Sequence, residues 1–180
     1  MPQVSDSRAP RIDTLLAAYA AGTLSEPFAV LAASHLQMKA DKLRAPHQAI
    51  PAVDDMNALM PLALRSYVGR HLGGAIEWRT ILPGLKLCRI AQDASFLHCR
   101  PGKAIPAHTH EGLEAVLVLR GGFRDATGHY VAGDIAVADD TIEHRPIADR
   151  GADCVIFIVR EGPVKLTGRV GRFIQLIFGA

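Results

Sequence analysis

The sequence predicts an α+β fold in which a small N-terminal helical domain precedes an all-β domain. In the first 74 residues, apolar side chains recur close to the helical period. Beyond them the chain breaks into short strand-like runs separated by turns that contain glycine or proline. We therefore expect a helical domain over residues 1–74 and a β domain over residues 75–180. A chain of 180 residues can hold one full domain and a small companion.

Three helices are expected in the N-terminal part. Asp13 is a candidate N-cap for the first helix and Gly22 its stop, while Ser25 is a candidate N-cap for the second. A linker with three prolines then separates the second helix from the third. The expected helices cover residues 14–21, 26–43 and 62–72.

The β domain is expected to contain ten further short strands besides the segment around residue 109. Each is an apolar or alternating run, and the turns between them include Pro83-Gly84, Gly121-Gly122 and Thr127-Gly128. Such a series of short strands is typical of a β-sandwich or a β-barrel. The expected strands are 76–82, 85–90, 94–100, 116–119, 123–125, 129–131, 135–137, 143–145, 154–159 and 173–178.

A cluster of metal-binding residue types surrounds the apolar run at residues 116–119. His108 and His110 are two residues apart, so in an extended strand both imidazoles point the same way. Glu114 can join them if the chain turns at Gly112, and His144 follows downstream. Three imidazoles and one carboxylate suit zinc, iron, manganese or nickel. We predict one divalent ion there, with zinc as the first expectation.

The same stretch resembles the first motif of the cupin family. Gly102, His108, His110, Glu114 and Gly121 match its fixed positions. The resemblance implies a jelly-roll barrel in which the two histidines and the glutamate bind the metal, together with His144 from the second motif. The second motif, G-D-I-A-V-A-D-D-T-I-E-H-R-P, is similar to the cupin of the ChrR-type anti-sigma factors.

The helical part resembles the sigma-binding domain of the same family, most closely at A-A-Y-A-A-G-T-L-S-E. That domain holds a zinc ion through an early histidine and an H-x-x-x-C-x-x-C pattern. Here His35 matches the motif histidine, but Lys39 and Lys42 occupy both cysteine positions. A lysine ammonium repels a cation, so we predict no zinc in this part. His35 is then expected to be a helix-face residue with a polar neighbour.

The resemblance implies a regulatory protein. Its helical part would bind an extracytoplasmic-function sigma factor, and its metal-bound cupin would sense a stress signal. The alternative is a metal-dependent, dioxygenase-like cupin enzyme whose helical extension forms a homodimer. A third interpretation is a small-molecule binding module with neither activity.

Composition limits the classes of partner and the cellular compartment that we expect for this protein. The net charge of +2 and the lack of a Lys/Arg run argue against direct nucleic-acid binding, and no stretch is long enough to span a bilayer. Three scattered cysteines without a C-x-x-C pair predict a cytoplasmic protein with buried thiols. In the family a C-x-C pair follows the last metal histidine; Cys154 matches its first member, but Ile156 replaces the second.

Two acidic residues precede His144 and invite two interpretations. Asp139 and Asp140 could orient His144 by accepting its second ring N–H. Alternatively, they form a solvated turn.

Overall fold

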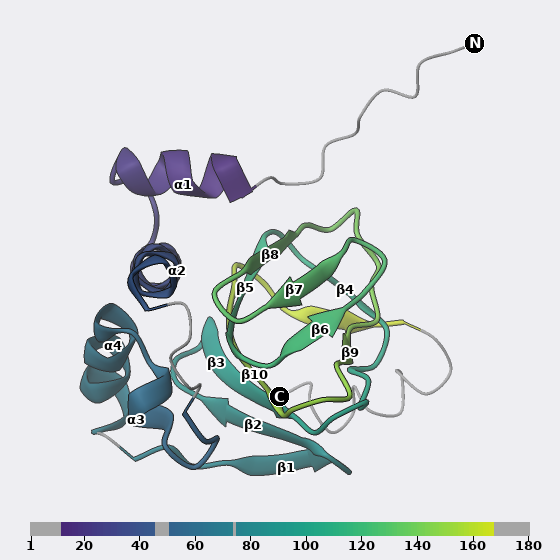
Figure 1. The fold of residues 1–180 in the computed structure, drawn as a ribbon. Helices are drawn as coiled ribbons and strands as arrows, with labels where there is room; N and C mark the ends of the chain where they lie inside the picture. The colour runs from purple at the N-terminus through teal and green to yellow at the C-terminus, as the bar shows by residue number, and fades with distance from the viewer. Residues whose placement is uncertain (1–11, 46–50, 74, 168–180) are drawn as a thin grey trace.

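The computed structural model describes residues 12–45, 51–73 and 75–167, and it confirms helices followed by a β-rich part (Figure 1). The predicted helices form within a few residues of their expected ends, and a short helix appears inside the expected linker. Asp13 lies within the first turn of the first helix rather than capping it. The helices are α1 Ile12–Ala20, α2 Glu26–Arg44, α3 Met56–Leu59 and α4 Leu62–Leu72.

Eleven strands follow in the described chain. Two short ones, β9 and β11, were not expected, while residues 143–145 form only an isolated bridge and residues 173–178 lie outside the described part. The strands are β1 Arg79–Leu82, β2 Leu85–Arg89, β3 Ala94–Cys99, β4 His108–His110, β5 Glu114–Arg120, β6 Gly122–Arg124, β7 His129–Val131, β8 Ile135–Ala138, β9 Ile147–Ala148, β10 Cys154–Arg160 and β11 Val164–Leu166.

The strands form three sheets rather than one continuously hydrogen-bonded barrel. The largest has six strands in the order β1-β2-β3-β10-β5-β8, and β7-β6-β9 and β11-β4 form the other two. The strand pairs are antiparallel. The smaller sheets curve over one face of the large sheet, and the helices lie on its other side (Figure 1). The interior between the sheets is where a ligand site can form.

Strand β10 shows why its sequence is an uninterrupted apolar run. Successive side chains of a strand point to opposite faces, and both faces of this strand are covered. Phe157 belongs to the cluster shared with the helices, whereas Ile156 and Ile158 belong to the cluster between the sheets. A strand that is buried on both faces can carry apolar residues at every position.

The helices are packed directly onto the large sheet. Leu31 of α2 and Tyr67 of α4 are almost fully buried, and they join Phe96 and Phe157 of the sheet in one hydrophobic cluster. The Tyr67 and Phe157 rings lie 6.4 Å apart, centroid to centroid. The helical part therefore obtains packing energy from the β part.

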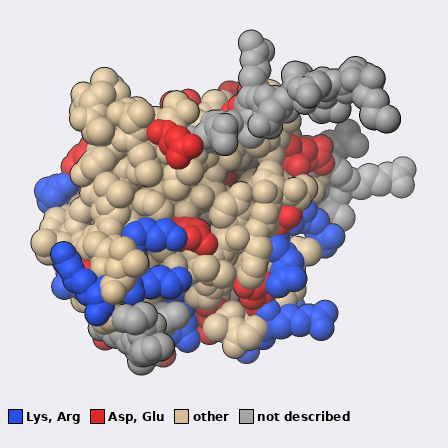
Figure 2. Space-filling view, turned by 45° about the horizontal axis from the view of Figure 1, so that its top comes forward, with Lys and Arg blue, Asp and Glu red and all other residues tan. Residues whose placement is uncertain are grey.

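The surface does not present one continuous basic face in the view of Figure 2. Lysines and arginines there lie among aspartates and glutamates, with a broad area of other residues between them. None of the helices in the described part of the chain is long and apolar enough to cross a bilayer.

Candidate metal centre

The four predicted metal ligands meet at one point inside the β part. Strand β4 presents His108 and His110, and β5 begins with Glu114. Gly112 turns the chain between them with φ +72°, and a Cβ there would lie 2.7 Å from Glu161 Oε2. His144 is brought in by the isolated antiparallel bridge that it forms with His108. The expected turn at glycine is thus present.

The geometry of the cluster fits a single ion. His144 Nε2 lies 3.0 Å from His108 Nε2 and 3.1 Å from His110 Nε2. Glu114 Oε1 lies 3.1 Å from His110 Nε2, and all four ligand atoms lie within 4.8 Å of one another. Two ligands about 2.1 Å from one zinc ion at a tetrahedral angle would lie roughly 3.4 Å apart. All four residues are buried.

Two of the imidazoles are held with their lone pairs toward the centre. His108 Nδ1 lies 2.7 Å from the Pro106 carbonyl, and His144 Nδ1 lies 2.8 Å from Asp125 Oδ2. A carbonyl or carboxylate oxygen only accepts, so Nδ1 is the donor in both contacts. Nε2 is then free to bind a metal in both rings. These residues could hold a metal ion.

The pKa shifts of His108 and Glu114 suit this role. Burial lowers the pKa of His108 to about 4, which keeps the ring neutral near pH 7. Burial alone would raise the pKa of Glu114, but the hydrogen bond from His110 and the charges of the neighbouring histidines and Arg160 outweigh it and lower that pKa. A neutral imidazole and an ionised carboxylate are the forms that bind metal.

Asp125 is a functional residue that the sequence analysis did not find. It lies just after β6, and its side chain is fully buried beside His144. Burial alone would raise its pKa, but hydrogen bonds from His144 and Thr127 lower it to about 2. Asp139 accepts a hydrogen bond from Thr141 at 3.0 Å instead, and Asp140 is exposed. The expectation that Asp139 or Asp140 orients His144 is therefore wrong, and the solvated-turn alternative describes them.

Replacing Asp125 with alanine should weaken metal binding by about 10- to 100-fold, because His144 would lose the acceptor that holds its ring. A competitive titration against a chromogenic chelator measures this. Asp125→Asn keeps an oxygen acceptor and should recover part of the affinity. Asp139→Ala is the matched control, since the Asp139 carboxylate bonds to Thr141 in its own turn. Equal loss in Asp125→Ala and Asp139→Ala would contradict the role given to Asp125.

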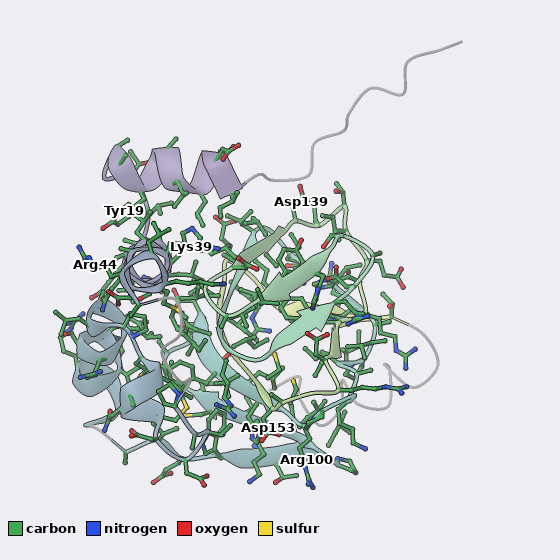
Figure 3. The ribbon with its side chains drawn as sticks, in the orientation of Figure 1. Tyr19, Lys39, Arg44, Arg100, Asp139 and Asp153 are labelled. Carbon is green, nitrogen blue, oxygen red and sulfur yellow. The ribbon has the colours of Figure 1, made fainter. Side chains whose placement is uncertain are left out.

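The degenerate zinc motif of α2 makes a different set of contacts. His35 Nδ1 donates to the Gly133 carbonyl at 2.7 Å, and Lys39 Nζ lies 2.6 Å from Asp134 Oδ1. Figure 3 shows Lys39 between α2 and the β strands. His35 is the expected helix-face residue with a polar neighbour. Together these contacts, which we call the α2 latch, join the helix to the turn before β8.

The three cysteines are buried and free, as expected of small apolar residues. Cys99 and Cys154 are opposite each other in the β3–β10 ladder. Burial raises the pKa of Cys99 to about 12 and also raises the pKa of Cys154. The reactive thiolate is therefore suppressed at both positions.

Comparison with known proteins agrees with this site and this fold. The ChrR cupin-like domain family matches residues 73–165. The anti-sigma-E factor ChrR of Cereibacter sphaeroides is 34% identical, and the alignment covers 92% of this chain and 95% of that protein. The chain belongs to the ChrR family. The match includes the helical part as well as the cupin.

Solved structures extend the comparison of this ChrR-family protein. The crystal structure of Rhodobacter sphaeroides SigE in complex with the anti-sigma ChrR matches with a TM-score of 0.65 and 36% identity, over 86% of this chain and 99% of that chain. An RmlC-like cupin protein from Ralstonia eutropha matches with a TM-score of 0.50 and 18% identity, over 56% of this chain and 73% of its own. The latter supports the cupin fold alone.

Proposed function

We propose that this protein is an anti-sigma factor whose helical part binds an extracytoplasmic-function sigma factor. The observation that carries the proposal is the near-full-length similarity to a ChrR chain that was solved in complex with SigE. The similarity extends beyond the cupin, which is common to many activities, into the helices. It favours regulation over the dioxygenase-like enzyme.

Exposed leucines on the helical part supply a surface for such a partner. Leu36 is 45% exposed, Leu43 86% and Leu62 66%. Leu36 and Leu43 are seven residues apart on α2 and so lie on the same helix face. The Leu62 N–H donates to the side chain of Gln37, which places the start of α4 beside Leu36. Large exposed apolar side chains that are close together are typical of protein–protein contacts.

The cupin is proposed to hold one divalent ion at His108, His110, Glu114 and His144, with zinc first among the candidates. Neutral imidazoles and a carboxylate accept zinc, iron, manganese or nickel, and availability selects among them. No zinc is proposed for the helical part, where the α2 latch engages His35 and Lys39. The protein would act in the cytoplasm, without contacting DNA itself.

The α2 latch connects the metal centre to the helices through strands β5 and β8. Its β side is the turn at Gly133 and Asp134, which leads into β8, and β8 pairs with β5. In that pairing Ala138 lies opposite the ligand Glu114. A change at the metal that moves the start of β5 would therefore reach the residues that hold α2.

Affinity capture of the tagged full-length chain from its own cells tests the proposal, with mass spectrometry of the proteins recovered. We expect a sigma factor to be recovered, and its yield to fall at least about tenfold in the Leu36→Asp/Leu43→Asp variant, because charge placed in an apolar contact is not solvated there. Val131→Asp/Ile147→Asp is the matched control, since Val131 and Ile147 are exposed apolar residues of the cupin part. Recovery of the chain alone, as a homodimer, would overturn the proposal in favour of a stand-alone metal cupin.

A further inference from the structure

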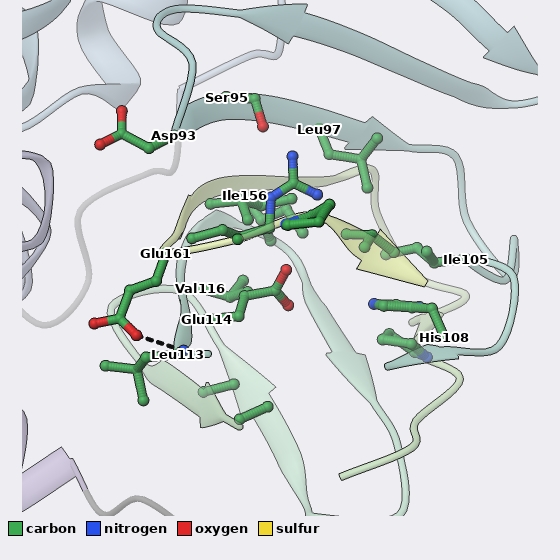
Figure 4. Close-up of a pocket in the computed structure, with 18 of the residues that line it drawn as sticks. Asp93, Ser95, Leu97, Ile105, His108, Leu113, Glu114, Val116, Ile156 and Glu161 are labelled. Atoms are coloured by element: carbon green, nitrogen blue, oxygen red, sulfur yellow. Dashed lines mark hydrogen bonds between the residues drawn. The ribbon is translucent and has the colours of Figure 1, made fainter. Parts of the chain in front are cut away.

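A cavity of about 1420 Å³ extends from the metal cluster along the inner face of the large sheet. Figure 4 shows Ser95 and Leu97 on one wall, and Glu114 and His108 across from them. The lining also includes Leu24, in the connection between α1 and α2. One ligand-sized space therefore touches both the metal residues and the helical part.

Two arginines line this cavity, Arg89 of β2 and Arg160 of β10, and Arg160 lies closer to the metal cluster in the sheet register. Arg160 lies opposite Glu114 in the antiparallel β5–β10 ladder, so the two side chains share a face of the sheet. Ile158 lies two residues before Arg160 on the same face, and Ser95 is its partner on β3. The register thus directs Arg160, Ser95 and Glu114 into the same interior.

The charge of Arg160 acts on Glu114, but in the described part of the chain neither the Arg160 guanidinium nor the Ser95 hydroxyl has a hydrogen-bond partner. Within residues 12–45, 51–73 and 75–167, no side chain forms a hydrogen bond or ion pair with the Arg160 guanidinium. The buried Ser95 Oγ likewise has no hydrogen-bond partner there. Glu114 is engaged by His110, and Glu161 accepts the N–H of Leu113. A buried hydroxyl left without a partner is destabilising, and a ligand that bonds to it removes that cost.

We propose that this cavity binds a small organic carboxylate with an apolar body. The guanidinium fork of Arg160 pairs with the carboxylate, and the Ser95 hydroxyl donates to it. Leu97, Ile156 and Ile158 form the apolar wall against which the body packs. Arg160 and a bound metal ion both repel a cationic ligand, and the apolar wall disfavours a fully polar anion such as inorganic phosphate.

This proposal deepens the sensing role proposed above and rests on it for the consequence of binding, though not for binding itself. A carboxylate at Arg160 lies beside Glu114, which is both a metal ligand and the cross-strand neighbour of Arg160. The same cavity is lined by Leu24, Ser25 and Phe28, and Phe28 belongs to the cluster that holds the helices on the sheet. Occupancy would therefore be sensed at the metal and at the base of α2.

Isothermal titration of the zinc-loaded full-length protein with hexanoate tests the site. We expect hexanoate to bind, and hexan-1-ol and hexylamine to bind at least about tenfold more weakly, because neither can form the charged pair. Arg160→Gln should reduce hexanoate affinity by at least about tenfold, and Arg160→Lys by less, since it keeps the charge without the fork. Arg79→Gln, an exposed arginine of β1, is the matched control and should bind hexanoate like the unaltered protein.

Metal content and melting temperature establish that each variant is folded before titration. Equal affinity of the unaltered protein and Arg160→Gln for hexanoate would overturn the proposal, as would hexan-1-ol binding as tightly as hexanoate or no heat with hexanoate. If Arg160→Gln does not fold, Ser95→Ala replaces it, with several-fold weaker binding expected. Binding that leaves a captured sigma complex unchanged would overturn the sensing role while supporting the site.

Discussion

Replacing both His108 and His110 with alanine is expected to abolish metal binding by the cupin. The two rings supply half of the ligand set, and both are buried against His144 at the centre of the site. Two remaining ligands cannot hold a borderline ion against water and free chelators. Elemental analysis after zinc saturation and desalting should show the content falling from about one ion per chain to below about a tenth.

His129→Ala is the control for this change. His129 is also a histidine of the β part, but it is half-exposed and its Nε2 lies 2.7 Å from Asp149 Oδ2, away from the cluster. Its removal should leave the metal content unchanged. Near-full occupancy in the double alanine variant would refute the single four-ligand site.

Replacing Phe157 with alanine should produce the largest loss of stability, about 3–5 kcal/mol in the free energy of unfolding. Phe157 is fully buried, and its ring lies 5.7 Å from that of Phe96 and 6.4 Å from that of Tyr67, centroid to centroid. Removing it leaves a cavity at the contact between the helices and the sheet. Urea unfolding followed by fluorescence and by far-ultraviolet circular dichroism measures the change.

The matched control for Phe157→Ala is Leu43→Ala, because Leu43 is 86% exposed on α2. Its loss should change the free energy of unfolding by less than about 0.5 kcal/mol. If Phe157→Ala cost under about 1 kcal/mol, the shared core would not be what holds the helices on the sheet. The same conclusion would follow if, in the unaltered protein, the helices unfolded at a lower urea concentration than the strands.

The helical part shows which features can be predicted from residue patterns and which cannot. The apolar period predicted α2, and the lysines at positions 39 and 42 predicted that the zinc of the family is missing. What would stabilise a helical part without zinc could not be predicted, because the contacts are made with residues about a hundred positions away. The Gly133 carbonyl and the Asp134 carboxylate form the α2 latch, and the large sheet supplies the packing.

The convergence of the candidate metal ligands was predictable for a local reason. The period of two along a strand and the turn at Gly112 act over seven residues, so His108, His110 and Glu114 converge by backbone geometry alone. His144 was assigned only through the family resemblance, and the strand expected around it is an isolated bridge to His108. The sequence predicted a jelly-roll barrel. The structure has a cupin fold whose strands form three sheets rather than one continuously hydrogen-bonded barrel.

By itself, the sequence determined the order of helices and strands, the metal-binding residue types and the membership of the ChrR family. Each of these depends on spacing along the chain or on matched motifs. Only the tertiary structure decided that Asp125 orients His144 and that Arg160 lies opposite Glu114. Both pairings join segments that are distant in sequence. The pairing of Arg160 with Glu114 also depends on strand register, and register is set by the packing of both sheet faces at once.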